Sequence, residues 1–278
     1  MDRFLVIDGS NLLFQMFFGM PARIVNGQGK AIQGTFGFVG AMLKIIRMVS
    51  PTHVTVVFDG EHENKRKELN PEYKGNRIDY GMVPEEENPF SQLPDVYKAL
   101  DYLKMKYTET IDTEADDLIA GYALSLGGKT EVVIASFDSD FFQLITDKVS
   151  VLRYRGEKTV ICTPAYVKER FGVIPGQYAD FKSLVGDRAD NIKGAEKVGA
   201  KTAASLLNEF GSLENILAGA EKIRWPSVRE SIIRNTDRLK KNRQLIKLEA
   251  CEALPFEEEE LAYFYDGIKT KEVIKGIE

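Results

Sequence analysis

The sequence has few of the residues that soft metals and covalent catalysis require. Its 278 residues include two cysteines, two histidines and one tryptophan. The cysteines, Cys162 and Cys251, lie far apart and form no CxxC pair, so neither a zinc site nor a disulfide is expected. Free thiols fit a reducing compartment, and we expect a cytoplasmic location.

Long apolar runs are also missing. The longest apolar runs are short, such as FLVI at residues 4–7, and are well below the length needed to span a bilayer. The start, MDRFLVIDGSN, lacks the basic flank and long apolar stretch of a secretion signal. We therefore expect no membrane segment.

The sequence has no overall excess of positive charge. A net charge of −5 ordinarily argues against a nucleic-acid partner. The charges are segregated, however: residues 221–247 carry nine Lys/Arg and three acids, and residues 248–278 carry nine acids and three Lys. Composition alone therefore leaves the partner open.

Short β-branched and aromatic runs predict buried strands at residues 3–7, 53–58 and 131–136. Helical periodicity at residues 34–49 and 115–126 separates them. This alternation predicts an α/β fold, a doubly wound parallel sheet flanked by helices. The runs VSVLRY and KTVICT, on either side of RGE, predict a hairpin or a sheet edge.

The strand signal disappears after Pro164. We expect helices at residues 164–171, 175–185, 200–210, 212–219, 226–234 and 236–247. The chain is thus predicted to contain an α/β domain at 1–164 and a helical domain at 165–278. Residues 61–92 are polar and rich in Pro, Gly and Glu, and so long an irregular segment is usually functional or disordered. We expect it to be mobile without a ligand, because it has little apolar surface to bury.

Acidic residues follow every predicted core strand, and acids recur in two further motifs. They are Asp8 in IDGSN, Asp59 in FDG, Asp138 and Asp140 in FDSD, Glu114, Asp116 and Asp117 in TEADD, and Asp187 and Asp190 in GDRADN. The carboxyl ends of parallel strands line one edge of a sheet, where ligands bind. The strand-end carboxylates are therefore expected to point into one crevice.

Each motif also has an ordinary structural interpretation. An aspartate after a strand is a common turn residue, and Thr113 with Asp116 resembles a helix capping box. Several carboxylates together are different, since two of them about 4 Å apart repel by about 4 kcal/mol at an effective dielectric near 20. Cations must neutralise such a cluster.

The chemistry of these ligands selects the ion. A set of oxygen ligands favours Mg²⁺ or Mn²⁺ over zinc. Because the motifs supply no histidine base and no Ser or Cys nucleophile, attack by metal-activated water on a phosphodiester is the natural mechanism. Two ions, roughly 3.5–4 Å apart in such sites, would hold the attacking and leaving oxygens. Gly34, Gly37 and Gly40 have the wrong spacing for a dinucleotide fingerprint, so no organic cofactor is expected.

The motifs taken together resemble a known family. IDGSNLLF, PTHVTVVFDG, EYKGNR, TEADDLI, DSDFFQL, SLVGDRADNIKG and VGAKTAASLL, between about residue 3 and about residue 220, are similar in order to the motifs of the bacterial 5′–3′ exonuclease, or flap endonuclease, family. That family includes the N-terminal nuclease domain of DNA polymerase I. The resemblance implies a PIN-like domain, two Mg²⁺ ions (or Mn²⁺), and structure-specific hydrolysis of DNA with 5′ ends or 5′ flaps. RNA/DNA hybrids are an alternative substrate, and a monomer is expected.

The resemblance also implies roles for residues. One ion would be held by Asp8, Asp59, Glu114 and Asp116, the other by Asp138, Asp140 and Asp187, with Asp117 and Asp190 completing the site. Residues 61–92 would form a helical arch over a 5′ single strand. Its phosphate contacts would be Lys65, Arg66, Tyr73, Lys74 and Arg77, with Lys74 also serving catalysis.

A helix–three-turn–helix motif is implied at residues 191–205. Gly194, Gly199, Lys201 and Thr202 would approach the phosphates of a duplex, and family members often bind K⁺ there. Lys197 stands where the family pattern has a glycine, which leaves K⁺ binding open.

Phe137 and Ser139 replace a Gly and a Lys of the third-strand motif, and we expect altered packing or rate with retained chemistry. Two alternatives remain at this point: a PIN-type ribonuclease and a non-catalytic module that binds branched DNA. A stand-alone nuclease and a fragment are equally open.

Overall fold

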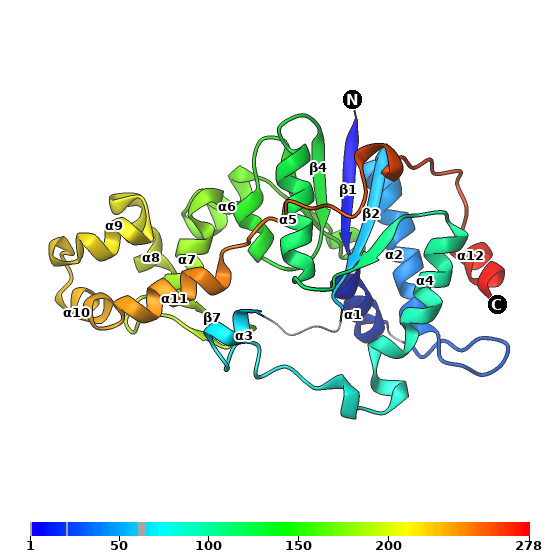
Figure 1. The fold of residues 1–278 in the computed structure, drawn as a ribbon, viewed down its shortest axis with the longest axis horizontal. Helices are drawn as coiled ribbons and strands as arrows, with labels where there is room; N and C mark the ends of the chain where they lie inside the picture. The colour runs from blue at the N-terminus through cyan, green and yellow to red at the C-terminus, as the bar shows by residue number, and fades with distance from the viewer. Residues whose placement is uncertain (1, 21, 61–64) are drawn as a thin grey trace.

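The computed structural model describes residues 2–20, 22–60 and 65–278, with the backbone alone for Lys65. A six-stranded sheet forms the centre of the larger part (Figure 1). Its order is β3 (Tyr107–Glu109), β2 (His53–Phe58), β1 (Arg3–Asp8), β4 (Glu131–Ala135), β5 (Val149–Arg153) and β6 (Val160–Cys162). The first five strands are parallel, and β6 pairs antiparallel with β5. This confirms the predicted parallel sheet and its hairpin edge.

Helices cover both faces of this sheet. On one face lie α1 (Gly9–Gly19), α2 (Gln33–Val49), α4 (Leu93–Tyr102) and α12 (Thr270–Ile277), and α5 (Ala115–Leu126) covers the other. Side chains along β1 alternate between the two faces of the sheet. Leu5 and Ile7 join the core around α2, and Phe4 and Val6 join the core around α5. The helices α1, α4 and α12 and the three-residue strand β3 were not predicted.

The helical region extends from the α5 face. It consists of α6 (Pro164–Phe171), α7 (Tyr178–Val185), α8 (Ala200–Phe210), α9 (Leu213–Ala218), α10 (Pro226–Arg234) and α11 (Thr236–Ile246). Between α7 and α8 a small hairpin forms from β7 (Gly186–Asp187) and β8 (Ile192–Lys193). One apolar core runs from the α5 face into these helices. Across the described ranges, no helix combines the length and the apolar character needed to cross a membrane.

The polar segment at 61–92 differs from the expected helical arch. Its described part contains α3 (Lys65–Leu69) and short 3₁₀ turns at Tyr80–Met82, Glu85–Glu87 and Pro89–Gln92. Prolines at 71, 84 and 89 interrupt any longer helix. Residues 66–77 make buried ion pairs through Arg66 and bury Tyr73, and the expected mobility of the segment stays a prediction. Residues 61–64 lie outside the described residues.

The end of the chain returns to the sheet. After α11, residues 247–262 cross back over α5, and a β-bridge joins Ala262 to His53 (Figure 1). The last helix, α12, then packs on α2 and α4. The boundary at residue 164 stays a prediction; Val273 and Ile274, which that prediction placed in the helical domain, are buried in the core around α2.

Candidate metal centre and nucleic-acid interface

Asp8 and Asp59 lie at the carboxyl edge of the sheet because β1 and β2 are parallel and in register. Asp8 also caps α1: one carboxylate oxygen accepts the Asn11 N–H at 2.9 Å and the other accepts the Ser136 hydroxyl at 2.7 Å. Asp59 accepts the Ala115 N–H at 3.0 Å, at the start of α5. The predicted Thr113 capping box is wrong, since α5 begins after Glu114 without a side-chain cap and Asp59 supplies the acceptor instead.

The carboxylates of this edge perturb one another. Burial, then the charges of Asp59 and Asp138, raise the pKa of Asp8 to about 7. Burial, followed by the charges of Asp138, Asp8 and Asp59, raises the pKa of Asp116 well above its ordinary value. The structure thus brings Asp8, Asp59, Asp116 and Asp138 together, as predicted. An added cation would relieve this repulsion.

A second acidic group adjoins the first. Asp140, Asp187 and Asp190 each offer an oxygen, and these oxygens all lie within 4.8 Å of one another. Asp140 begins a 3₁₀ turn after β4, while Asp187 and Asp190 lie in β7 and the turn that follows it. Burial raises the pKa of Asp140 to about 7 against the opposing charge of Lys182, with Asp138 adding to the rise. The charge of Asp138 therefore acts on carboxylates of both groups.

Lys182 was missed by the sequence analysis. It is buried in α7, and its ammonium contacts both Asp140 and Asp187. Burial alone would lower the pKa of Lys182, but the two carboxylates raise it, so the side chain stays charged. The available signal was a lysine in the predicted helix at 175–185, one helical turn before the GD motif.

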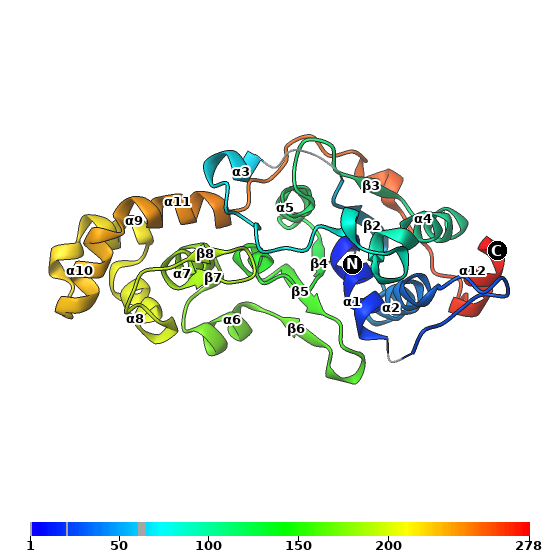
Figure 2. The same ribbon diagram turned by 90° about the horizontal axis from the view of Figure 1, so that it is seen from below.

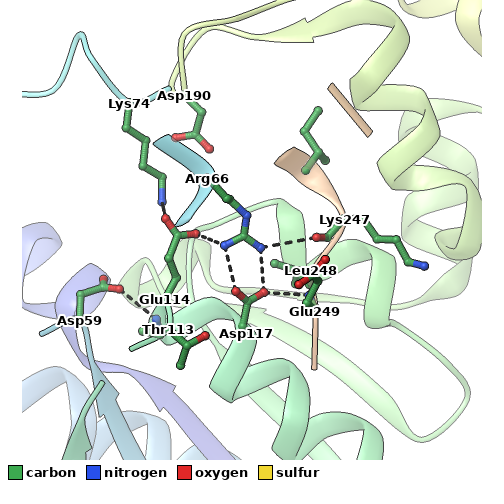
Figure 3. Close-up of polar contacts among 12 residues, drawn as sticks. Asp59, Arg66, Lys74, Thr113, Glu114, Asp117, Asp190, Lys247, Leu248 and Glu249 are labelled. Atoms are coloured by element: carbon green, nitrogen blue, oxygen red, sulfur yellow. Dashed lines mark hydrogen bonds and ion pairs between the residues drawn. The ribbon is translucent and has the colours of Figure 1, made fainter. Parts of the chain in front are cut away.

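Glu114 and Asp117 face the polar segment (Figure 3). Glu114 accepts from the Lys74 ammonium at 2.8 Å and is also paired with Arg66. Both oxygens of Asp117 accept from the Arg66 guanidinium, at 2.9 and 2.8 Å. Both Asp117 oxygens therefore contact Arg66, and its place among the metal ligands stays a prediction.

The predicted phosphate-contacting residues differ in exposure. Arg66 and Tyr73 are buried, with relative exposures of 8% and 3%. Lys74 is half-buried and Arg77 is exposed, and Arg77 bonds to Asp190 at 2.8 Å. Lys74 and Arg77 border the acidic groups; the Lys74 side chain is 13% exposed and the Arg77 side chain 53%. The Lys65 side chain lies outside the described residues.

The predicted helix–three-turn–helix motif corresponds to β8, the following turns and the start of α8. Gly194 packs against the end of α7 so closely that a Cβ there would lie 2.3 Å from the Val185 carbonyl carbon. Gly199 has open space and precedes α8, where Lys201 is exposed and Thr202 half-buried. Lys197 has a left-handed backbone, with φ at +66°, a conformation that glycine adopts more readily than lysine.

Two family profiles match consecutive parts of the chain. The profile described as "5′-3′ exonuclease, N-terminal resolvase-like domain" matches residues 3–172. The profile described as "5′-3′ exonuclease, C-terminal SAM fold" matches residues 173–266. Together they span both the sheet and the helical region.

Curated relatives include DNA polymerases. The chain is 33% identical over 247 residues to thermostable DNA polymerase I of Thermus thermophilus, covering 88% of this chain and 28% of that protein. It is 31% identical over 292 residues to DNA polymerase I of Streptococcus pneumoniae, covering 99% of this chain and 33% of that protein. The chain thus spans about a third or less of the length of these relatives.

Solved structures with a similar fold include nucleases. The T5 D15 protein co-crystallised with metal ions superposes with a TM-score of 0.73 at 26% identity, covering 89% of this chain and 90% of that one. The catalytic core of Rad2 in complex with a DNA substrate gives a TM-score of 0.62 at 14% identity, covering 99% and 87%. At that identity the second likeness shows the fold alone.

Proposed function

This chain belongs to the 5′-3′ exonuclease family, and we propose that it is a divalent-metal-dependent nuclease that hydrolyses phosphodiester bonds at 5′ ends and 5′ flaps of DNA. One observation carries the proposal: acids from three parallel strands, from α5 and from β7 converge at one edge of the sheet, beside the cationic side chains of Lys74 and Arg77. The donors are all oxygens, several are buried, and their raised pKa values indicate a site that gains stability from added positive charge.

We assign one ion to Asp8, Asp59, Glu114 and Asp116, and a second to Asp138, Asp140, Asp187 and Asp190. Two bound divalent ions supply neutralisation of the charge that develops on the attacking and leaving oxygens. Mg²⁺ fits these hard ligands, and Mn²⁺ is the expected substitute.

The protein's own cations orient the substrate. Lys74 lies 2.8 Å from Glu114, so its ammonium can meet a phosphate that approaches this carboxylate. Arg77, half-exposed beside Asp190, provides a second contact for the same strand. Such fixed charges place the scissile phosphate over the carboxylates, which is a large part of phosphoryl-transfer catalysis.

The helical region is proposed to bind the duplex. The α8 N-terminus offers free backbone N–H groups next to the exposed Lys201 and half-buried Thr202, an arrangement suited to phosphate. K⁺ binding at this hairpin stays a prediction. A monomer and a cytoplasmic location stay predictions.

Cleavage of labelled substrates tests the proposal. We expect a 5′-flap duplex to be cut with Mg²⁺ and left intact in excess EDTA, and a single-stranded RNA of the same sequence to be cut far more slowly. Asp147→Asn is the control for amide variants of the site carboxylates such as Asp8→Asn, because Asp147 is exposed and lies before β5, outside the site. Cleavage in excess EDTA would refute the mechanism, and preference for RNA would favour a PIN-type ribonuclease.

A further inference from the structure

Arg66 is buried in a three-part contact. Its guanidinium donates to both oxygens of Asp117 in the two-pronged geometry that arginine and carboxylate favour, and it also pairs with Glu114 (Figure 3). Its relative exposure is 8%. A phosphate could reach this guanidinium only after these contacts had opened.

Asp117 also holds the segment that leaves the helical region. Its carboxylate accepts the Glu249 N–H at 2.8 Å, and its backbone carbonyl accepts the Cys251 N–H at 3.2 Å. Arg66 in turn donates to the Lys247 carbonyl at 3.5 Å. The pair therefore joins three parts of the chain: α3, the first turn of α5, and residues 247–251.

Asp117 faces a different direction from Asp116. Adjacent residues on an α-helix project about 100° apart, so their side chains leave the helix in different directions. Asp116 points toward Asp8, Asp59 and Asp138, whose charges act on it. The Asp117 oxygens are taken by Arg66 and Glu249, which leaves little acceptor capacity for an ion.

Tyr73 provides a second anchor for the same segment. Its ring is buried among Ala179, Ile192, Leu245 and Ile246 of the helical region. Lys74 follows directly, with a left-handed backbone at φ +55° whose N–H donates to the Asp190 carbonyl at 3.1 Å. Anchors on either side of residues 67–72 thus fix where the Lys74 ammonium lies.

We propose that Arg66 and Asp117 are a positioning pair: they hold residues 66–77 and 247–251 against α5 and thereby place Lys74 at the metal centre, and neither contacts phosphate or metal. The proposal rests on the proposed nuclease function for its catalytic consequence. Its structural part, the anchoring and the absence of Asp117 from the ligand set, is tested without any DNA.

Metal titration compares two neighbouring carboxylates. Calorimetry with Mn²⁺ alone should show that Asp116→Asn weakens binding by about tenfold or more. Asp117→Asn should weaken it by about threefold or less, because a charge outside the ligand set acts only through screened Coulomb interaction. Equal losses in the two variants would make Asp117 a ligand and overturn the proposal.

Limited proteolysis tests the anchoring. Chymotrypsin should spare the buried Tyr73 in the wild-type protein and cut there in Arg66→Lys and Asp117→Asn. Lysine keeps the charge and loses the two-pronged geometry, so it should not restore protection. The matched control is Arg170→Ala, an exposed arginine on α6, which should leave Tyr73 protected. Thermal melts verify that each variant is folded, and protection of Tyr73 in folded Arg66→Lys and Asp117→Asn would refute the anchor.

Salt dependence of DNA binding separates positioning from phosphate contact. Lys201→Ala, at the proposed duplex contact, should reduce the log–log slope by about 0.9. Arg66→Lys and Arg66→Ala should leave the slope and KM near wild type and lower kcat by similar factors. A slope reduced by about one in Arg66→Ala, restored in Arg66→Lys, would identify Arg66 as a phosphate contact. If the wild-type protein cleaves no DNA, the proposed function fails, while the titration and proteolysis still decide the role of the pair.

Discussion

Several carboxylates at the sheet edge have two roles in the structure. Asp8 caps α1 and Asp59 caps α5, so the same oxygens that would hold a cation also satisfy backbone N–H groups at helix starts. The capping contacts of Asp8 and Asp59 are therefore compatible with the proposed metal-binding role. Amide substitutions separate the two roles, because asparagine is also a good N-cap.

Asp8→Asn should fold and fail to catalyse. The amide keeps the cap to the Asn11 N–H, and removing the charge relieves the repulsion from Asp59 and Asp138. We expect turnover to fall by at least about 100-fold, since substitutions outside the ligand set alone cost about 10–100-fold. DNA binding should stay measurable, and the metal-free protein should melt no earlier than wild type at about pH 8. Steady-state cleavage and thermal melts measure both effects, and wild-type turnover would exclude Asp8 from the site.

The raised pKa values predict how stability depends on pH. Asp8 and Asp140 have a pKa of about 7 in the folded metal-free protein, against an ordinary 3.8. Between about pH 4 and pH 7 the folded protein holds protons that the unfolded chain has released, so the free energy of unfolding falls as pH rises. Asp95 and Asp187, whose pKa values are lowered, contribute in the opposite direction only below about pH 4.

Calorimetric melts in EDTA and in Mg²⁺ test this dependence. The Tm in EDTA should fall from about pH 5 to about pH 8, and Mg²⁺ should raise the Tm more at the higher pH, because bound ions displace those protons. Asp8→Asn should flatten the slope in EDTA. A Tm that rises over this range without metal would show that other groups dominate.

Some of these residues could be predicted from the sequence and others could not. The strand-end acids followed from the strand pattern, because parallel strands bring their carboxyl ends to one edge. The partners of Asp117 and Asp140 could not be predicted, because Arg66 and Lys182 reach them through tertiary contacts across 51 and 42 residues. No local periodicity encodes such a pair.

At the scale of elements, the β7–β8 hairpin depends on close backbone packing. A Cβ at Gly194 would lie 2.4 Å from the Leu184 carbonyl oxygen, whereas one at Gly199 would have nothing within 4 Å. Gly194→Ala should therefore destabilise the protein by about 1–3 kcal/mol through overpacking. Gly199→Ala should cost less than about 1 kcal/mol, the amount by which Ala is a poorer N-cap than Gly.

The same two variants should also differ in how their loss of duplex affinity compares with their loss of stability. At Gly199 an added methyl group would keep a phosphate from the α8 N–H groups, so duplex affinity should fall although the fold is intact. Urea denaturation and duplex titration measure the two quantities. Unchanged affinity in Gly199→Ala would place the duplex elsewhere on the helical region.

Some predicted helices matched the structure closely, whereas α1, α4, α12 and the strand β3 were not predicted. Helices at 115–126 and 200–210 matched α5 and α8 to the residue. The short strand β3 pairs at the sheet edge and carries half-buried or exposed side chains, so it leaves no apolar run in the sequence. The segment after residue 248 is rich in acids, and nothing in its composition indicates that α12 buries Val273 and Ile274 against the far side of the sheet.

At the scale of the whole molecule, the C-terminal segment returns to the sheet and ends in α12, which packs on α2 and α4. Ile274→Ala should lower the free energy of unfolding by about 2–5 kcal/mol, because the side chain is buried among the helices on that face. Ile233→Ala, at a residue of α10 that is 45% exposed, should change it by about 0.5 kcal/mol or less.

The single tryptophan allows the cooperativity of unfolding to be measured. Trp225 lies in the helical region, packed against the core that continues from the α5 face. If that shared core makes the molecule unfold as one unit, Ile274→Ala should shift the urea midpoint of Trp225 fluorescence as much as that of circular dichroism. A shift in circular dichroism alone would reveal two independently unfolding parts.

The path of the chain back across α5 places its last residue beside α12 and α4, at the opposite end of the long axis from α10 (Figures 1 and 2). A dye or a surface linker joined at residue 278 would therefore stand clear of the carboxyl edge. A second dye on the exposed Arg234 of α10 would complete a donor–acceptor pair along that axis. Single-molecule energy transfer between the two dyes would report any rotation of the helical region relative to the sheet while the protein is bound to its substrate.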